Sequence, residues 1–217
     1  MAPAYHAQCY GTQQGSITVA QTGTTSGPSY SNNYSNGSIR QGSQSAAAAK
    51  GGSSDLETMG WISMGPGPSN GLCFSPTNTS SKLVYRFSGV AFSVSLIANC
   101  SGGTGTASAS YNFSLEGNIY DLSTSSFVWR GNLATPVANH TVSCASGTIQ
   151  KSVHPYRGLH TILVTGKTST FSTYDKYWFI VTTHLTTQAS ATGTGSSATA
   201  LVKNLALTLS SIRCPNC

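Results

Sequence analysis

Residues 106–120 alternate between apolar and polar side chains, and this pattern constrains the fold more than any other feature of the sequence. The apolar positions are Ala107, Ala109, Tyr111, Phe113, Leu115 and Ile119. The polar positions between them are Ser108, Ser110, Asn112, Ser114, Glu116 and Asn118. Successive side chains of a β-strand point to opposite faces, so a period of two indicates a strand with one packed face and one wet face.

The same period of two recurs along the chain after residue 82. The apolar phase shifts at Gly89, and a shift at glycine is typical of a β-bulge or bend. We expect further strands at 139–150, 158–165, 176–187 and 198–213, and a hairpin loop at 121–126. The strand at 176–187 carries apolar residues in both phases, which predicts a central position in a sheet.

The overall pattern predicts an all-β protein. No segment shows a period of 3.6 residues with helix caps. Seven or eight strands joined by short polar turns favour a two-sheet β-sandwich, either Ig-like or jelly-roll-like. We expect this domain at 56–217, after an extended, low-complexity Gly/Ser/Thr-rich N-terminal arm at 1–55. One strand-sized apolar segment lies in the arm, formed by Ser16, Ile17, Thr18, Val19 and Ala20.

Charge and cysteine usage indicate an extracellular protein. Only 7% of the residues are charged, whereas 62 of 217 are Ser or Thr. The even number of cysteines in such a chain favours disulfides, with 15 possible pairings of Cys9, Cys73, Cys100, Cys144, Cys214 and Cys217. Residues 1–15 lack the apolar run of a signal peptide, so a secreted form is expected to be the mature chain. No stretch is apolar enough to span a membrane.

The chain contains six N-x-S/T sequons, so we also expect N-glycosylation, which is typical of a cell-surface protein. The candidate acceptors are Asn33, Asn36, Asn78, Asn99, Asn112 and Asn139. Chance alone gives about half as many in a chain so rich in Ser and Thr, so the sequons support a glycoprotein without establishing one.

The titratable residues predict no catalytic site, no metal and no cofactor. Glu116 and Asp121 are five residues apart on a strand and would point to opposite faces, which does not suit a glycosidase pair. The five histidines show no ligand spacing, and Cys214-Pro-Asn-Cys217 has no second half of a zinc site. The eleven Lys and Arg residues are spread singly, which argues against nucleic-acid binding despite a net charge of +6. We therefore expect a protein that is not an enzyme.

Two classes of function remain. Residues 82–213 resemble, in composition and pattern only, the secreted β-sandwich subunits of archaeal or bacterial filaments. Such a subunit would polymerise with copies of itself, donating Ser16–Ala20 as a strand to the open sheet edge of a neighbour. The alternative is a secreted carbohydrate-binding or adhesion module, with Trp61 or Trp129 as a sugar-stacking surface. A viral coat or tail subunit is a variant of the first class.

Overall fold

The structure is a computed structural model, and it describes the backbone in nine ranges. These are residues 7–9, 17–23, 25–26, 38–41, 44–49, 52–64, 83–121, 123–164 and 177–214. Every secondary-structure element in these ranges is a β-strand, and all strand pairs are antiparallel. Among the described residues there is no helix that could cross a membrane.

The first sheet, sheet A, has seven strands. Its main path runs β10 (Ile149–Val164), β7 (Leu83–Asn99), β12 (Ser197–Cys214), β5 (Gln44–Ala49) and β3 (Thr25–Ser26). Two further short strands, β1 (Ala7–Cys9) and β4 (Ser38–Gln41), also pair with β12. The long strands β10, β7 and β12 therefore form the body of sheet A.

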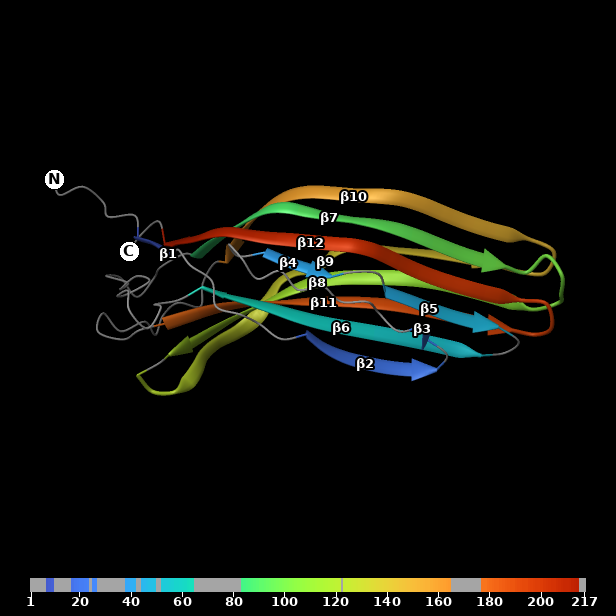
Figure 1. Cartoon of the computed structure of the whole chain (residues 1–217), viewed down its shortest axis with the longest axis horizontal. Helices are drawn as coiled ribbons and strands as arrows, with labels where there is room; N and C mark the ends of the chain where they lie inside the picture. Colours follow the sequence, from blue (N-terminus) through green and yellow to red (C-terminus); the bar gives the residue numbers. More distant parts are fainter. Residues whose placement is uncertain are drawn as a thin grey trace.

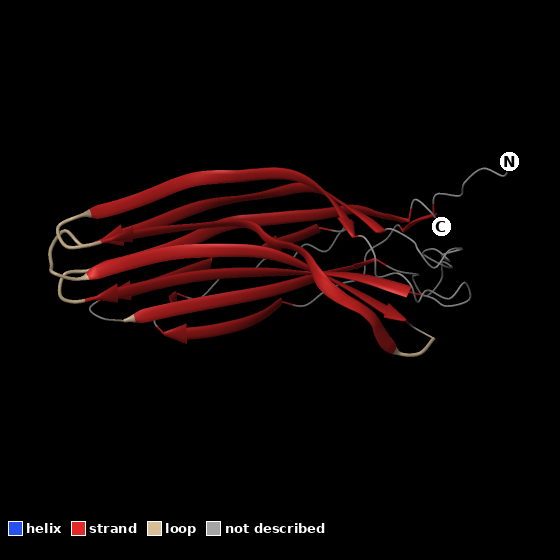
Figure 2. Cartoon of the chain, turned by 180° about the vertical axis from the view of Figure 1, so that it is seen from behind, coloured by secondary structure: helices blue, strands red, loops and turns tan. Residues whose placement is uncertain are grey.

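The second sheet, sheet B, has five strands. Its order is β2 (Ile17–Gly23), β6 (Ser53–Met64), β11 (Tyr177–Thr192), β8 (Thr106–Asp121) and β9 (Ser126–Cys144). As predicted, the strand after residue 176 is central, with β6 on one side and β8 on the other. Figures 1 and 2 show the two sheets as long layers that run in the same general direction.

The two sheets pack face to face, which confirms the predicted all-β two-sheet sandwich. The alternating positions of β8 behave as predicted: the six apolar residues from Ala107 to Ile119 are at most 4% exposed. Most of the polar residues between them are partly or fully exposed, with Asn118 the most buried at 8%. Phe92 of β7 connects the layers, because its ring contacts Phe113 and Tyr111 of β8 edge-on and stacks on Tyr156 of β10.

The predicted phase shift at Gly89 is a β-bulge. Gly158 of β10 pairs with Val90, whereas His160 pairs with Phe87, so two residues of β7 oppose one residue of β10. The bulge returns apolar side chains to the core on both sides of Gly89, where Phe87 and Val90 are at most 1% exposed. The sequence signal and the structure agree here because an odd shift in register must reverse the face of every later residue.

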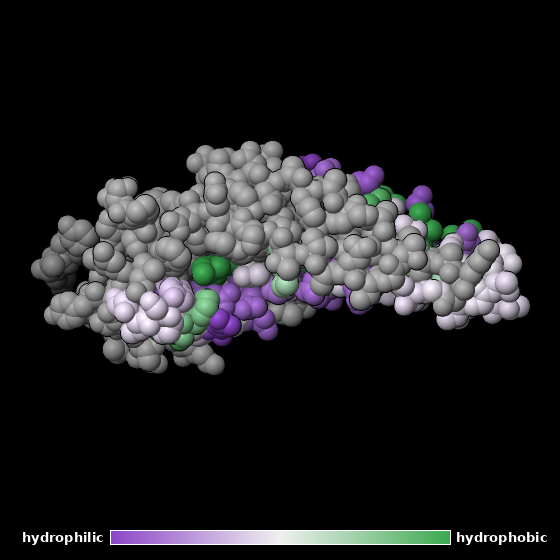
Figure 3. Space-filling model, turned by 60° about the horizontal axis from the view of Figure 1, so that its bottom comes forward, coloured by the Kyte–Doolittle hydropathy of each residue, from purple (hydrophilic) through white to green (hydrophobic). Residues whose placement is uncertain are grey.

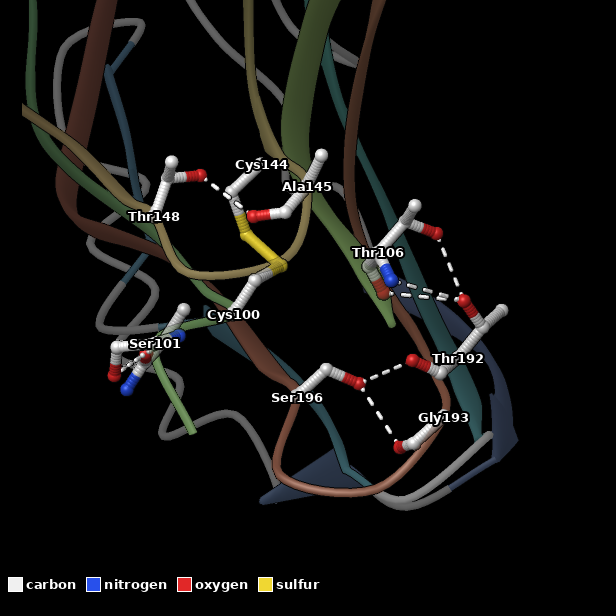
Figure 4. Close-up of a disulfide and its surroundings, with 10 residues drawn as sticks. Cys100, Ser101, Thr106, Cys144, Ala145, Thr148, Thr192, Gly193 and Ser196 are labelled. Carbon is white, nitrogen blue, oxygen red and sulfur yellow. Dashed lines mark hydrogen bonds between the residues drawn. A yellow bond between two sulfur atoms is a disulfide. The ribbon is translucent and has the colours of Figure 1, made fainter. Parts of the chain in front are cut away.

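The loops 100–105, 145–148 and 193–196 each connect one sheet to the other, and all three lie at the same end of the sandwich. A disulfide joins Cys100, at the end of β7, to Cys144, at the end of β9, and so links sheet A to sheet B (Figure 4). Backbone hydrogen bonds strengthen the same junction: Cys100 N–H donates to the Thr148 carbonyl at 2.8 Å, and Gly147 N–H donates to the Cys100 carbonyl at 2.9 Å.

The described parts of residues 1–55 lie against the domain. Ile17–Gly23 pairs with β6, and Gln44–Ala49 pairs with β12. Ser53–Met64 forms one continuous strand, so the expected boundary at residue 55 falls inside β6. The sequence predicted a strand at Ser16–Ala20 but none at 38–49, where alanine and polar residues carry no clear alternation.

A buried hydroxyl in the core leads to a stability prediction. Tyr85 is fully buried, its phenol oxygen has no hydrogen-bond partner among the described residues, and burial raises the pKa of this group. An unpaired buried hydroxyl costs roughly 1–3 kcal/mol, so Tyr85→Phe is expected to raise the free energy of unfolding by about 1 kcal/mol. Urea denaturation measures this. Tyr111→Phe is the control, because the Tyr111 hydroxyl lies 3.5 Å from His154 Nε2 and no gain is expected. A destabilised Tyr85→Phe variant would contradict the prediction.

Candidate ligand-binding face

The outer face of sheet B carries three of the four described carboxylates, together with His184, Gln188 and Arg130. We call it the groove face and define it by the outward residues of four strands. These are Ser53, Asp55, Glu57 and Met59 of β6, the even-numbered residues 180–190 of β11, the even-numbered residues 108–118 of β8, and Phe127 and Arg130 of β9. The alternation of β8 and β11 produces this face directly, since the odd-numbered residues are buried in the core.

The first hollow in the groove face lies near the hairpin that joins β8 to β9. Its volume is about 350 Å³. It is lined by Met59, Glu116, Asn118, Phe127, Arg130, Ile180, Thr182 and His184. This hairpin projects at the lower left of Figure 1, and Figure 3 shows hydrophilic residues beside a smaller group of apolar ones near it. The hollow therefore combines polar groups with apolar and aromatic surface.

A second hollow of about 350 Å³ lies further along the same strands. It is lined by Ser53, Asp55, Ser108, Ser110, Gln188, Ala189 and Ser190. Gln188 occupies its centre: its Nε2 donates to Asp55 Oδ2 at 3.1 Å, and its Oε1 accepts from Ser110 Oγ at 3.5 Å. The carboxamide is thereby oriented by one residue on each neighbouring strand.

His184 joins two carboxylates across the face. Its Nδ1 lies 3.3 Å from Glu57 Oε1, and its Nε2 lies 3.5 Å from Glu116 Oε2. Only the first contact has hydrogen-bond geometry, so Nε2 has no hydrogen-bond partner among the described residues. The side chains of Glu57 and Glu116 are 39% and 34% exposed, so both carboxylates can reach solvent or a ligand.

An aromatic and a cation form the rim of the first hollow. The Arg130 guanidinium carbon lies 3.7 Å from the centre of the Phe127 ring, and the Tyr120 ring meets Phe127 edge-on at 5.0 Å. Phe127 is nevertheless 43% exposed. Because the N–H groups of a guanidinium lie in its own plane, stacking on Phe127 directs these donors sideways, along the rim.

The predicted disulfide and glycosylation residues fall in different places. Cys100 and Cys144 are bonded, whereas Cys73 and Cys217 and the side chains of Cys9 and Cys214 lie outside the described residues. Asn33, Asn36 and Asn78 also lie outside them. Asn99 accepts hydrogen bonds from the N–H and hydroxyl of Ser101 in its own turn. Asn112 and Asn139 are exposed and directly opposite each other on β8 and β9. Glycosylation stays a prediction at all six.

The predicted subunit contact also stays a prediction. Residues 17–20 pair with β6 of the same chain, and Ser16 lies outside the described residues. Of the two tryptophans proposed for sugar stacking, Trp129 packs against the core, where its indole covers Gly117 and Gly131. The backbone of Trp61 pairs with Thr182, and its side chain lies outside the described residues.

Sequence reasoning did not single out Phe127, Arg130, His184 or Gln188 as site residues. The outward phase of β8 was recognised, but only the pairing of β8 with β11 and β9 brings these side chains together. No group of three or more potential metal ligands occurs within the described ranges.

Comparisons with known proteins give only distant matches. No protein-family model and no curated protein matches the sequence. Among solved structures, the chain is similar to TmCBM61 in complex with β-1,4-galactotriose, at 5% identity over 89% of this chain and 88% of that one, with a TM-score of 0.20. It is also similar to the CBM22-1–GH10 modules of Clostridium thermocellum endo-1,4-β-D-xylanase 10B complexed with xylohexaose, at 13% identity over 80% of this chain and 26% of that one, with a TM-score of 0.16.

A third similar structure is that of the infectious bursal disease virus Gt strain. The match has 10% identity, covers 97% of this chain and 43% of that one, and has a TM-score of 0.16. At such TM-scores none of these matches identifies a relative, so the function has to be argued from the residues of the chain itself.

Proposed function

We propose that the chain is a secreted β-sandwich module that binds a carbohydrate along its groove face. The observation that carries the proposal is the pair of hollows on one sheet face, both lined by hydroxyl, carboxamide and carboxylate side chains, with the exposed Phe127 ring at one end. Carbohydrate binding is the alternative function expected from the sequence, but the sequence did not identify the groove face as its site.

The chemistry of the lining suits a sugar. A sugar ring presents hydroxyls around its edge and C–H groups on its faces, so its site needs planar polar side chains together with an aromatic or apolar surface. Asn118, Glu116 and Arg130 supply the former, and Phe127 and Ile180 supply the latter.

The spacing of the hollows favours an oligosaccharide over a single sugar. Thr182 lines the first hollow and Gln188 the second, and both lie on β11. Six residues of strand span about 20 Å. His184 and Thr186 lie between them on the same face, so a glycan chain extended along β11 would contact polar side chains throughout.

Binding without catalysis and an extracellular location are part of the proposal. Glu57 and Glu116 both contact the His184 ring, so they do not face each other across an open cleft. This arrangement suits a fixed polar lining better than an acid and a nucleophile on either side of a glycosidic bond. The Cys100–Cys144 disulfide is typical of an oxidising compartment.

Isothermal titration of unglycosylated protein with a panel of neutral polysaccharides tests the proposal. Unglycosylated protein is needed because a glycan on Asn112 would occupy the groove face. At least one polysaccharide is expected to bind the unchanged chain. Phe127→Ala is expected to weaken binding about tenfold, since an aromatic contact is worth about 1–1.5 kcal/mol.

Val153→Ala is the matched control. Val153 is 63% exposed on the outer face of sheet A, so it also removes exposed apolar surface but leaves the groove face unchanged. Equal affinities of the Phe127→Ala and Val153→Ala variants, or no binding by the unchanged chain across the panel, would overturn the proposal.

A further inference from the structure

The outer face of sheet A is basic. Arg86 of β7, Lys151 and Arg157 of β10, and Lys203 of β12 are all exposed on it. They are four of the five Lys and Arg residues whose side chains are described; the fifth is Arg130. No described carboxylate lies on this face. Residues spread singly along the sequence are therefore gathered by the fold, and we call this surface the basic face.

The described carboxylates lie on the other side of the sandwich. Asp55, Glu57 and Glu116 belong to the groove face. The remaining described acid, Asp121, is 3% exposed and accepts hydrogen bonds from the backbone N–H groups of Ser123 and Thr124, so it is used within the hairpin. Apart from Arg130 at the rim of the first hollow, the exposed described charges are thus sorted by sign between the two outer faces.

The basic residues lie along three neighbouring strands. Pro155 of β10 pairs with Ser93 of β7, which pairs with Lys203 of β12. Lys203 is therefore in the same row as Pro155, between the rows of Lys151 and Arg157. Ser93 and Val153 fill the space between these charges with small or apolar groups.

We propose that copies of this chain stack, with the basic face of one copy on the groove face of the next. Charge complementarity selects a second copy as the occupant, because the four bases of one face meet a face whose three described carboxylates outnumber its one described base, Arg130. Three strands of about 16 residues cover on the order of 700 Å², close to the roughly 800 Å² that each partner buries in a standard interface. The contact joins two different surfaces, so it is heterologous and continues as an open stack.

The stacking contact depends on exposed charges and so on salt. An exposed ion pair contributes up to about 1 kcal/mol, and its attraction is screened beyond roughly 10 Å at 0.1 M salt and 3 Å at 1 M. Three acids facing four bases therefore give an association that is present at low ionic strength and absent at high ionic strength. Stacking does not require carbohydrate binding, and a glycan in the groove and a stacked copy would exclude each other.

A charge-exchange experiment tests the stack by sedimentation velocity of the unglycosylated chain. The first variant, Lys151→Glu with Arg157→Glu, leaves two acids and two bases on the basic face, which then has no net charge. The second, Glu57→Lys with Glu116→Lys, makes the groove face basic. The unchanged chain is expected to sediment faster with rising concentration at about 20 mM salt, and as a monomer at about 500 mM. Each variant by itself is expected to sediment as a monomer at both salt concentrations.

The mixture of the two variants decides the question. The formal net charges become +2 (+6 − 4) and +10 (+6 + 4), so net charge predicts repulsion. Matched faces predict association, because the unchanged basic face of the second variant meets the unchanged groove face of the first. The stack is supported if species that sediment faster than the monomer appear in the mixture at low salt and in neither variant by itself. A monomeric mixture, a monomeric unchanged chain at low salt, or variants that still associate alone would overturn it. Circular dichroism of each variant verifies the fold.

Discussion

Replacing Cys100 and Cys144 together by alanine is expected to lower the free energy of unfolding by about 4 kcal/mol. The bridge closes a chain segment with a sequence separation of 44. In the chain-entropy treatment, a closed loop of that length removes about 13 cal/mol/K from the unfolded state, which is about 4 kcal/mol at 25 °C. The effect is large because the closed loop is long, and the bridge also joins a strand of sheet A, β7, to a strand of sheet B, β9.

Guanidinium denaturation of both proteins under oxidising conditions measures this difference. Alanine is a better replacement than serine because Cys100 is fully buried and Cys144 is 8% exposed. A serine hydroxyl at either position would be left unpaired. Thr148→Ala is the control in the same junction. It removes the hydrogen bond from Thr148 Oγ to the Ala145 carbonyl at 2.7 Å and should cost only about 1 kcal/mol. Similar losses in the two variants would show that the bridge does not restrain the unfolded chain.

Alternation predicted the sandwich because each strand must bury one of its two phases between the sheets and leave the other phase outside. The strand at 106–120, the bulge at Gly89 and the central position of β11 all follow from which residues must be inside. Local composition was sufficient for these features, since a shift by one residue would expose Phe113 and its neighbours.

The candidate site could not be predicted in the same way. Phe127 and Arg130 are three residues apart, yet their stacking depends on the irregular register of β9 against β8, where Ile119 pairs with Trp129 and Tyr120 with Phe127. The sorting of charge between the faces has the same origin. Each Lys and Arg is isolated in the sequence, and only the order β10–β7–β12 brings Lys151, Arg157 and Lys203 to one surface.

The pairing of Cys100 with Cys144 was likewise open at the level of sequence, since three bridges have 15 possible arrangements. It follows from the fold because β7 ends at Asn99 and β9 ends at Cys144, at the same end of the sandwich. Glycine is a different case. The loops 100–105 and 193–196 pack closely against each other at their glycines, and this packing has no signature in the sequence.

Gly105→Ala is expected to lower the free energy of unfolding by about 3 kcal/mol. Gly105 lies just before β8 and is buried against the loop that leads from β11 to β12. A Cβ atom added there would overlap the Thr192 carbonyl oxygen and lie 3.0 Å from Ser196 Oγ. The Thr192 carbonyl accepts a hydrogen bond from Ser196 Oγ, so moving it would disturb its loop as well (Figure 4). Overpacking against well-packed neighbours costs about 1–3 kcal/mol, and backbone atoms yield least.

Gly102→Ala separates this collision from the general effect of replacing a loop glycine. Gly102 is in the same loop, its φ is not in the left-handed region, and an added Cβ would meet only ordinary contacts at 3.7 Å and 4.0 Å. Thermal denaturation should therefore leave Gly102→Ala close to the unchanged chain and lower the melting temperature of Gly105→Ala. Gly147→Ala tests backbone strain alone, since its φ is +79° and nothing lies within 4 Å of an added Cβ. It should cost about 1 kcal/mol. If Gly105→Ala and Gly102→Ala had the same melting temperature, the loops 100–105 and 193–196 would have to be further apart than the structure places them.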